Sequence, residues 1–351
     1  MKTPTGKVAL RLVSNRLAEM LEGDPDAADV RTSSAGADGA ATVAVAGFEF
    51  AVQWGSSGAA ASVDSAAALA VERAGAAGEK VIPLVAVPFM GDVGRERCAA
   101  AGAAWLDLSG NALIMAPGLR IRVEGQPNRF KRPGRPSSPF APKSARIARW
   151  LLMHPGAALT QRDVAQATGM DEGFTSRIVS RLEEDDLIER ATDGGIRARD
   201  PDLLLDAWRE DYDFSKHDIR RGHVAARSGE ALSRRLGEAF GQAGVDYAAT
   251  GLSAAWLMTR FAGFRLATVY LAEHPGDDLL RELGFREESA GANVWLVVPN
   301  DAGVFHGATE HDTIRCVHPV QVYLDLLAHP ERAKEAAEHL RTELLRWRND
   351  G

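Results

Sequence analysis

Three short helices with well-marked ends follow one another between residues 144 and 185, and this pattern constrains the fold more than any other part of the sequence. The first predicted helix ends at the Pro-Gly pair 155–156. Thr160 is placed to accept a hydrogen bond from the amide three residues on and so to begin the second helix. A glycine-containing turn at 168–170 then leads to Asp171, the expected N-cap of the third helix.

The residues after the third helix predict a two-stranded hairpin. Residues 187–190 and 196–199 have strand character, and Asp193-Gly194-Gly195 between them is typical of a tight turn. Three crossed helices followed by such a hairpin form a winged helix-turn-helix, here over residues 143–200. This element predicts that the protein binds double-stranded DNA.

The third helix has two different faces. Thr175, Ile178 or Val179, and Leu182 recur at intervals of three or four residues and are expected to pack inward. The opposite face carries small hydroxyl and arginine side chains, which suit a major groove because arginine pairs with guanine or phosphate. The predicted DNA contacts are Thr160, Gln161, Phe174, Thr175, Ser176, Arg177, Ser180 and Arg181 from the helices, Arg190, Arg197 and Arg199 from the hairpin, and Arg129, Lys131, Arg132 and Arg135 from the preceding segment.

The charge distribution supports a nucleic-acid partner although the whole chain has a net charge of -7. Residues 120–149 hold nine basic residues and one acid, Glu124. Within them, residues 126–142 are rich in Pro, Gly, Ser and Arg, which is typical of an extended linker. Two interpretations remain open for this segment, a solvated hinge and a basic arm that touches DNA phosphates.

Four consecutive acids, Glu183 to Asp186, provide the main argument against a DNA role. They favour an alternative in which the winged helix is a protein-interaction module that neutralises a partner toxin. They lie at the end of the third helix that is remote from its groove-entering N-terminus.

Residues 1–125 predict an α/β domain with the element order of restriction-endonuclease-like proteins. Residues 24–39 are expected to form a loop, and Asp92 is expected to cap a helix. Nuclease chemistry of that type needs an acid and then Glu-x-Lys on the next strand to hold a metal ion. Glu49 is followed two residues later by Ala51 instead of lysine, so we expect a degenerate, inactive domain.

Residues 201–351 predict a second α/β domain, in which residues 219–241 are expected to be helical. The Gly251-Leu-Ser253 turn, a helix and the strand 266–271 are similar to the opening of a nucleotidyltransferase fold. That chemistry needs two alternate carboxylates on the strand to hold magnesium. The strand has none and Glu273 lies past it, so this domain is also expected to be degenerate.

No cofactor or metal site is expected. Cys98 and Cys316 are far apart and match no zinc pattern. His306, His311 and His318 surround Cys316 at no standard ligand spacing, and we expect exposed loop histidines. We also expect two histidines in an Arg-rich stretch, at 217 and 223, to be solvated.

The chain is expected to be cytoplasmic and unanchored. Its first residues lack the apolar run of a signal peptide, and no apolar stretch reaches the length that a membrane span needs.

Three runs in the C-terminal half resemble one family: ATGLSAAW at 249–256, VQVYLDLL at 320–327 and EAAEHL at 335–340. They are similar to the AbiEi-type antitoxins of type IV toxin–antitoxin systems, and the resemblance spans about 143–345. It implies a transcriptional regulator that binds and regulates its own promoter, with a nucleotidyltransferase toxin as the protein that it opposes. Family members usually begin with the winged helix, whereas about 125 residues precede it here.

The sequence therefore predicts a multidomain α+β or α/β protein: an N-terminal α/β domain (1–125), a basic linker (126–142), a winged helix (143–200) and a C-terminal α/β domain (201–351). Its predicted function is DNA-binding transcriptional regulation without catalysis, as a homodimer that reads two half-sites. The alternatives are a nuclease or nucleotidyltransferase and a toxin-neutralising interaction module.

Overall fold

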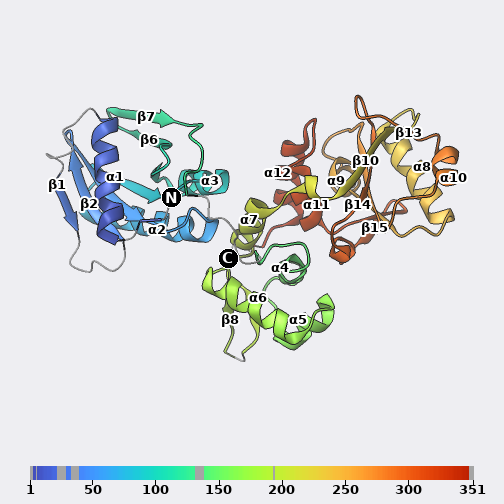
Figure 1. Ribbon diagram of the computed structural model, residues 1–351, viewed down its shortest axis with the longest axis horizontal. Coiled ribbons are helices and arrows are strands. Elements are labelled where there is room, and N and C mark those ends of the chain that lie inside the picture. The colour runs from blue at the N-terminus through green and yellow to red at the C-terminus, as the bar shows by residue number, and fades with distance from the viewer. Residues whose placement is uncertain are drawn as a thin grey trace. The chain divides into compact units, whose positions relative to one another are not determined.

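The computed structural model describes residues 3–4, 6–21, 29–32, 39–130, 138–192 and 194–347. The chain forms two compact units, residues 1–137 and 138–351 (Figure 1). The predicted DNA contacts Lys131, Arg132 and Arg135, and residue 193 of the hairpin turn, lie outside the described residues.

The N-terminal unit is built on a seven-stranded sheet whose strands lie in the order of the sequence. Strands β1 to β3 are antiparallel, β3, β4 and β5 run parallel, and β6 and β7 return antiparallel. The elements are α1 (Gly6–Met20), β1 (Asp29–Thr32), β2 (Ala40–Val45), β3 (Phe48–Trp54), α2 (Ala60–Ala77), β4 (Val81–Val87), α3 (Asp92–Ala101), β5 (Ala104–Asp107), β6 (Ala112–Ala116) and β7 (Leu119–Val123).

Helices cover both faces of this sheet, because alternate residues of its central strands are apolar on both sides. Leu84 of β4 packs with Leu17 of α1 in one core, whereas Val85 packs with Ala70 of α2 in the other. The unit is therefore a three-layer α/β/α structure (Figure 1).

Two local predictions for this unit are wrong. Strand β1 lies within the stretch 24–39 that was expected to be a loop, because its pairing with β2 is not visible in local composition. Asp92 does not cap α3 with its side chain; Gly91 is the N-cap, and the Asp92 carboxylate lies 3.5 Å from Arg95.

The second unit begins with the winged helix. Its elements are α4 (Ala145–Met153), α5 (Gln161–Thr168), α6 (Glu172–Glu184) and the hairpin of β8 (Ile188–Arg190) and β9 (Ile196–Ala198). Helix α4 packs against α5, α6 and β9 on one side and against α7 and α11 on the other. The winged helix and the C-terminal domain thus share one compact unit through α4.

The C-terminal domain surrounds a mixed seven-stranded sheet of order β13-β10-β14-β12-β11-β16-β15. Helices α8 and α10 lie on one side of this sheet and α11 and α12 on the other (Figure 1). The elements are α7 (Pro201–Asp211), η2 (Phe214–Lys216), β10 (Asp218–His223), α8 (Gly229–Gln242), β11 (Tyr247–Thr250), α9 (Gly251–Thr259), β12 (Ala267–Leu271), α10 (Asp277–Leu283), β13 (Arg286–Glu287), β14 (Val294–Val298), η3 (Ala302–Phe305), β15 (Thr309–His311), β16 (Ile314–Cys316), α11 (Pro319–Leu326) and α12 (Ala333–Leu344).

The helix expected over 219–241 is wrong in its first part. Residues 218–223 are strand β10, which pairs with β14 and β13, and the helix begins only after Ser228. The Ser228 hydroxyl accepts a hydrogen bond from the Ala231 amide, so this cap sets the true start of α8.

The helices of both units are too short or too polar to cross a membrane, as far as the described residues extend.

Candidate nucleic-acid interface

Side-chain caps fix the start of both helices of the helix-turn-helix. The Thr160 hydroxyl accepts from the Asp163 amide at 3.1 Å, and the Asp163 carboxylate accepts in return from the Thr160 amide at 3.3 Å. At α6, the Asp171 carboxylate accepts from the Phe174 amide at 2.7 Å. The two predicted caps, Thr160 and Asp171, are confirmed, and Thr160 stays exposed while Gln161 is half-buried.

The inner face of α6 is formed by Thr175, Ile178, Val179 and Leu182, all buried. Thr175 was also predicted to contact DNA, and this prediction is wrong. Its side chain is 0% exposed, and its hydroxyl donates to the Asp171 carbonyl at 3.0 Å. The residue therefore holds the first turn of the helix and has no face toward solvent.

The outer face of α6 presents Phe174, Ser176, Arg177, Ser180 and Arg181 to solvent, with Phe174 half-buried and the others exposed. The Phe174 ring centroid lies 5.7 Å from the Arg177 guanidinium and 5.8 Å from the ammonium of Lys143. We call these three residues, Lys143, Phe174 and Arg177, the Phe174 cluster. The position of Lys143 was not predicted, although the basic composition of 120–149 pointed to its neighbourhood.

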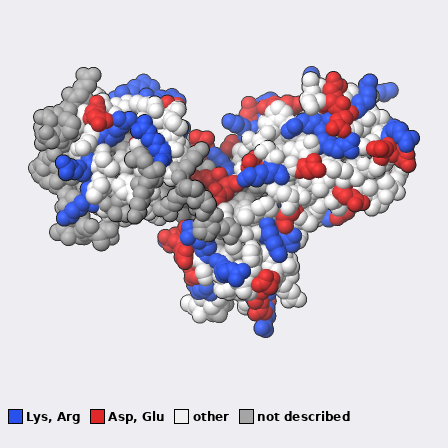
Figure 2. Space-filling model, viewed as in Figure 1, with Lys and Arg blue, Asp and Glu red and all other residues white. Residues whose placement is uncertain are grey.

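The β8–β9 hairpin is the wing of the winged helix, and the arginines on and beside it lie in ion pairs with nearby acids. Arg190 donates twice to Glu183, at 2.9 and 3.0 Å. Nε of Arg197 donates to Glu189 at 2.7 Å, and Arg199 to Asp186 at 3.3 Å. Figure 2 accordingly shows basic and acidic side chains intermingled over this part of the molecule.

Two further exposed arginines of the winged helix are also paired with acids. Arg181 pairs with Glu184 and Asp185, and Arg162 pairs with Glu172. Among the described residues of 138–200, the exposed cations that form no ion pair are Lys143 and Arg177. The exposed positive charge of the described winged helix that no ion pair compensates is thus concentrated at the Phe174 cluster.

The described ends of the basic linker are anchored. The backbone amide of Arg129 donates to the Ser109 hydroxyl at 3.3 Å in the N-terminal unit. In the second unit, Ser138 donates to Asp211 at 2.5 Å, and the Phe140 ring stacks on Trp208 at 6.5 Å between centroids. The chain entering the winged helix is therefore attached to α7.

Two arginines of α4 hold the winged helix against the C-terminal domain. Arg146 donates to both carboxylate oxygens of Asp301, at 2.7 and 2.8 Å, and to the Thr168 carbonyl at 3.1 Å. The Asp301 hydrogen bond raises the pKa of Arg146. Arg149 is 3% exposed and donates through Nη2 to the Gln321 side-chain oxygen at 2.6 Å.

Family comparisons agree with this division of the second unit. Residues 139–197 match the model of the MarR family, and residues 197–346 match that of the transcriptional regulator AbiEi, an antitoxin of type IV toxin–antitoxin systems. Residues 139–346 are thus similar to a winged helix followed by an AbiEi-type regulator, and we call residues 201–346 the AbiEi-type domain for this similarity. No curated protein and no solved structure matches the chain. Together the two matches support DNA-binding transcriptional regulation of the antitoxin kind as the function of the chain.

The core of the AbiEi-type domain contains a buried carboxylate, Asp325. It accepts hydrogen bonds from Thr250 at 2.5 Å, from the Gln321 amide nitrogen at 2.8 Å, from Tyr270 at 3.1 Å, and from Tyr212. Burial raises the pKa of Asp325 to about 6 and lowers the pKa of Arg149. Because Gln321 bonds both, it links the winged helix to this core.

The region that was compared with a nucleotidyltransferase site is filled by side chains. Thr268, on the strand where paired carboxylates would stand, lies 2.9 Å from Nε2 of His329. A Cβ on Gly251 would come within 2.5 Å of the same nitrogen, and the Ser253 hydroxyl donates to the Thr250 carbonyl at 2.8 Å. The Gly-Ser turn therefore contacts protein groups in the place where a nucleotide phosphate would bind.

The expectation of a solvated histidine at 217 is wrong. His217 is buried, its Nδ1 accepts from the Asn300 amide at 3.1 Å, and burial lowers its pKa to about 4. Burial likewise lowers the pKa of His318 to about 4 and raises those of Cys98 and Cys316 to about 12. Within the described parts of the chain, no group of His, Cys, Asp or Glu side chains is placed to hold a metal ion.

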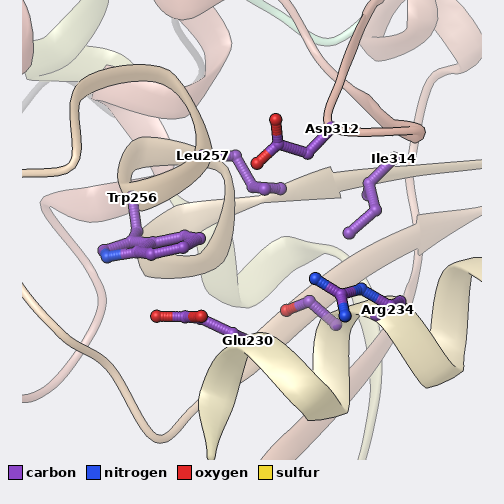
Figure 3. A pocket seen from close by; sticks show the side chains of 7 residues that line it. Glu230, Arg234, Trp256, Leu257, Asp312 and Ile314 are labelled. Atoms are coloured by element: carbon purple, nitrogen blue, oxygen red, sulfur yellow. The ribbon is translucent and has the colours of Figure 1, made fainter.

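A small, shallow pocket lies on the AbiEi-type domain. Figure 3 shows Trp256 and Arg234 on opposite sides of it. Its lining comes from α8, α9 and the β15–β16 hairpin, and includes Glu230, Ser233, Arg234, Trp256, Leu257, Asp312 and Ile314. None of these residues belongs to the winged helix.

Sequence reasoning missed the residues that join the two parts of this unit. Arg149 and Gln321 are 172 positions apart, so no local pattern connects them. A signal was nevertheless present, because Gln321 and Asp325 are polar residues four apart in an otherwise apolar helix, where buried polar groups need partners.

Proposed function

We propose that the chain binds its operator by placing the exposed face of α6 in the major groove. Ser176, Arg177, Ser180 and Phe174 contact base edges, and Lys143 contacts a phosphate. The observation that carries the proposal is the Phe174 cluster: the exposed cations left without ion pairs in the described winged helix, Lys143 and Arg177, lie 5.8 Å and 5.7 Å from the centroid of the Phe174 ring at the start of α6. Such cations attract phosphate and pair with guanine without first giving up another partner.

Under this proposal, each arginine of the wing contributes less to DNA affinity than Arg177 does. Arg190, Arg197 and Arg199 contact DNA only if they exchange a protein carboxylate for a phosphate. Such an exchange leaves the acid unpaired beside the DNA, where its repulsion from the phosphates offsets part of the new contact. The linker residues Arg129, Lys131, Arg132 and Arg135 remain proposed phosphate contacts.

We infer that neither flanking domain is catalytic. The N-terminal unit has the order α1-β1-β2-β3-α2-β4 with β3 parallel to β4, which supports a restriction-endonuclease-like ancestry. Glu49 is exposed on β3, and the position two residues on is Ala51. In the C-terminal domain, the contacts of His329 and Ser253 leave no open phosphate site at the Gly-Ser turn.

We propose that the regulator acts as a homodimer, since winged-helix regulators read two half-sites. A toxin protein is the proposed counterpart, on the strength of the antitoxin family match. Analytical ultracentrifugation with and without operator DNA tests the dimer; a monomer bound to a single half-site would reject it.

The experiment that tests the function is a mobility-shift titration with the DNA upstream of the chain's own gene. We expect a specific complex that survives excess unrelated DNA and is lost with Arg177→Ala. Magnesium- or manganese-dependent cleavage or nucleotide transfer that Glu49→Ala abolishes would favour the enzyme alternative. Co-purification of a toxin without any DNA shift would favour the interaction module.

A further inference from the structure

Phe174 is a half-exposed apolar side chain at the border between the buried face and the polar, exposed face of α6. The helix buries its other apolar residues, Ile178, Val179 and Leu182, against the winged-helix core. Phe174 lies at the edge of this buried face and is half-exposed, with the Lys143 ammonium 5.8 Å and the Arg177 guanidinium 5.7 Å from its ring centroid. An aromatic ring in this position is available to an apolar group of the DNA.

The major groove offers one apolar group, the C5-methyl of thymine. It also offers the O6 and N7 acceptors of guanine, which a single arginine binds with two hydrogen bonds. Phe174 and Arg177 are three residues apart on one helix face, so both reach the groove together. Their side chains supply one partner for each of these two base features.

The spacing within the cluster limits how far apart the two bases can be. The Arg177 guanidinium lies 5.7 Å from the Phe174 ring centroid. Successive base pairs are separated by about 3.4 Å. The separation therefore corresponds to one or two base-pair steps.

We propose that Phe174 contacts a thymine methyl and Arg177 pairs with a guanine one or two base pairs away, so that each operator half-site contains a T and a G at this spacing. This inference rests on the proposed function. Lys143, whose ammonium lies 5.8 Å from the ring centroid, contacts the adjoining phosphate and contributes affinity without sequence preference. Phe174 is thus a specificity-determining residue.

The test begins with selection of bound duplexes from a random library by the full chain. Each thymine of the selected site is then replaced, one at a time, by deoxyuridine, which keeps the base pair and removes only the methyl. We expect one thymine per half-site whose replacement weakens binding about fourfold, the worth of one buried methyl. The selected guanine should lie within two base pairs of it.

Variants assign the effect to the cluster. With Phe174→Ala the deoxyuridine duplex should bind as well as the thymine duplex, whereas Phe174→Leu should retain part of the difference. Arg177→Lys should keep affinity for DNA in general and lose the preference for guanine. Lys334→Ala, on the exposed side of α12, is the control and should leave the fourfold difference intact.

The outcomes separate this inference from the function on which it rests. If no duplex is enriched above background, the DNA-binding function fails and the inference fails with it. If a site is enriched but no thymine is sensitive to loss of its methyl, or the sensitivity persists in Phe174→Ala, the inference alone is overturned. Folding of each variant is checked by its circular dichroism spectrum, and Phe174→Leu keeps the test decisive if Phe174→Ala unfolds.

Discussion

Replacing Arg149 by methionine should destabilise the second unit far less than replacing it by alanine. Arg149 is 3% exposed, and its Nε and Nη1 atoms have no hydrogen-bond partner. Burial lowers its pKa, which means that the folded unit holds the charged form at a cost. Its favourable contacts are the hydrogen bond to Gln321 and the stacking of the guanidinium over Trp208, 5.0 Å from the ring centroid.

These terms give the size of the expected effects. Either substitution loses one charge-assisted hydrogen bond, about 1.5–3 kcal/mol, and removes two unpartnered donors whose burial costs a similar amount. Methionine fills most of the space, so we expect it to remain within about 1 kcal/mol of the wild type. Alanine also loses the packing of the side-chain stem and leaves a cavity, which adds about 2–3 kcal/mol.

Hydrogen exchange of the α4 and α11 amides in the full chain measures these differences, because it reports the opening of this unit separately from the N-terminal one. Arg281→Met, at a side chain that is 76% exposed, is the control and should change stability by less than about 0.5 kcal/mol. If methionine destabilises as strongly as alanine, the buried charge itself stabilises the unit and the reasoning is wrong.

Three further predictions concern the same unit. Burial lowers the pKa values of His217 and His329 to about 4, so the unfolded chain binds protons at these histidines at a higher pH than the folded chain does. The free energy of unfolding should therefore fall by about 3 kcal/mol for each histidine between pH 6.5 and pH 4. The pKa of Asp325 is raised to about 6, so its protonation between pH 6 and 4 stabilises the folded state and offsets part of this loss. Urea titrations should therefore show a free energy of unfolding that falls by less than the sum of the two histidine effects; a rise on acidification would contradict this. Gly251→Ala should destabilise more than Gly244→Ala in the same assay, since both glycines have positive φ but only the Cβ at 251 would clash, with His329; equal losses would refute the clash. Asp171→Ala should cost about 1 kcal/mol and speed exchange of the Phe174 amide, whereas Asp171→Asn, which keeps a capping oxygen, should not.

Local chemistry made the winged helix predictable. Its helix boundaries depend on caps within three residues, at Thr160 and Asp171, and on glycine at the turn. The inward face of α6 followed from its periodicity, which also placed Thr175 inside and conflicted with its inclusion among the DNA contacts. Where neighbouring residues determine the structure, the sequence sufficed.

Contacts between distant segments could not be predicted. Strand β10 exists because it pairs with β14 and β13, more than 60 residues away, and its Arg-rich sequence gave no sign of this. The ion pairs of the wing arginines and the Phe174 cluster depend on side-chain placement in three dimensions. The sequence thus predicted the helix that we propose to read DNA, but not which of the nearby cations are free of ion pairs.

The salt dependence of operator affinity tests most directly the claim that α6 reads DNA through its uncompensated charge. We expect log K to fall linearly with log salt, and Arg177→Ala to reduce the slope by about 1 per subunit. Arg197→Ala, which removes a paired arginine, should reduce it by clearly less. A slope that is flat in the wild type, or that Arg197→Ala lowers more than Arg177→Ala, would contradict the account.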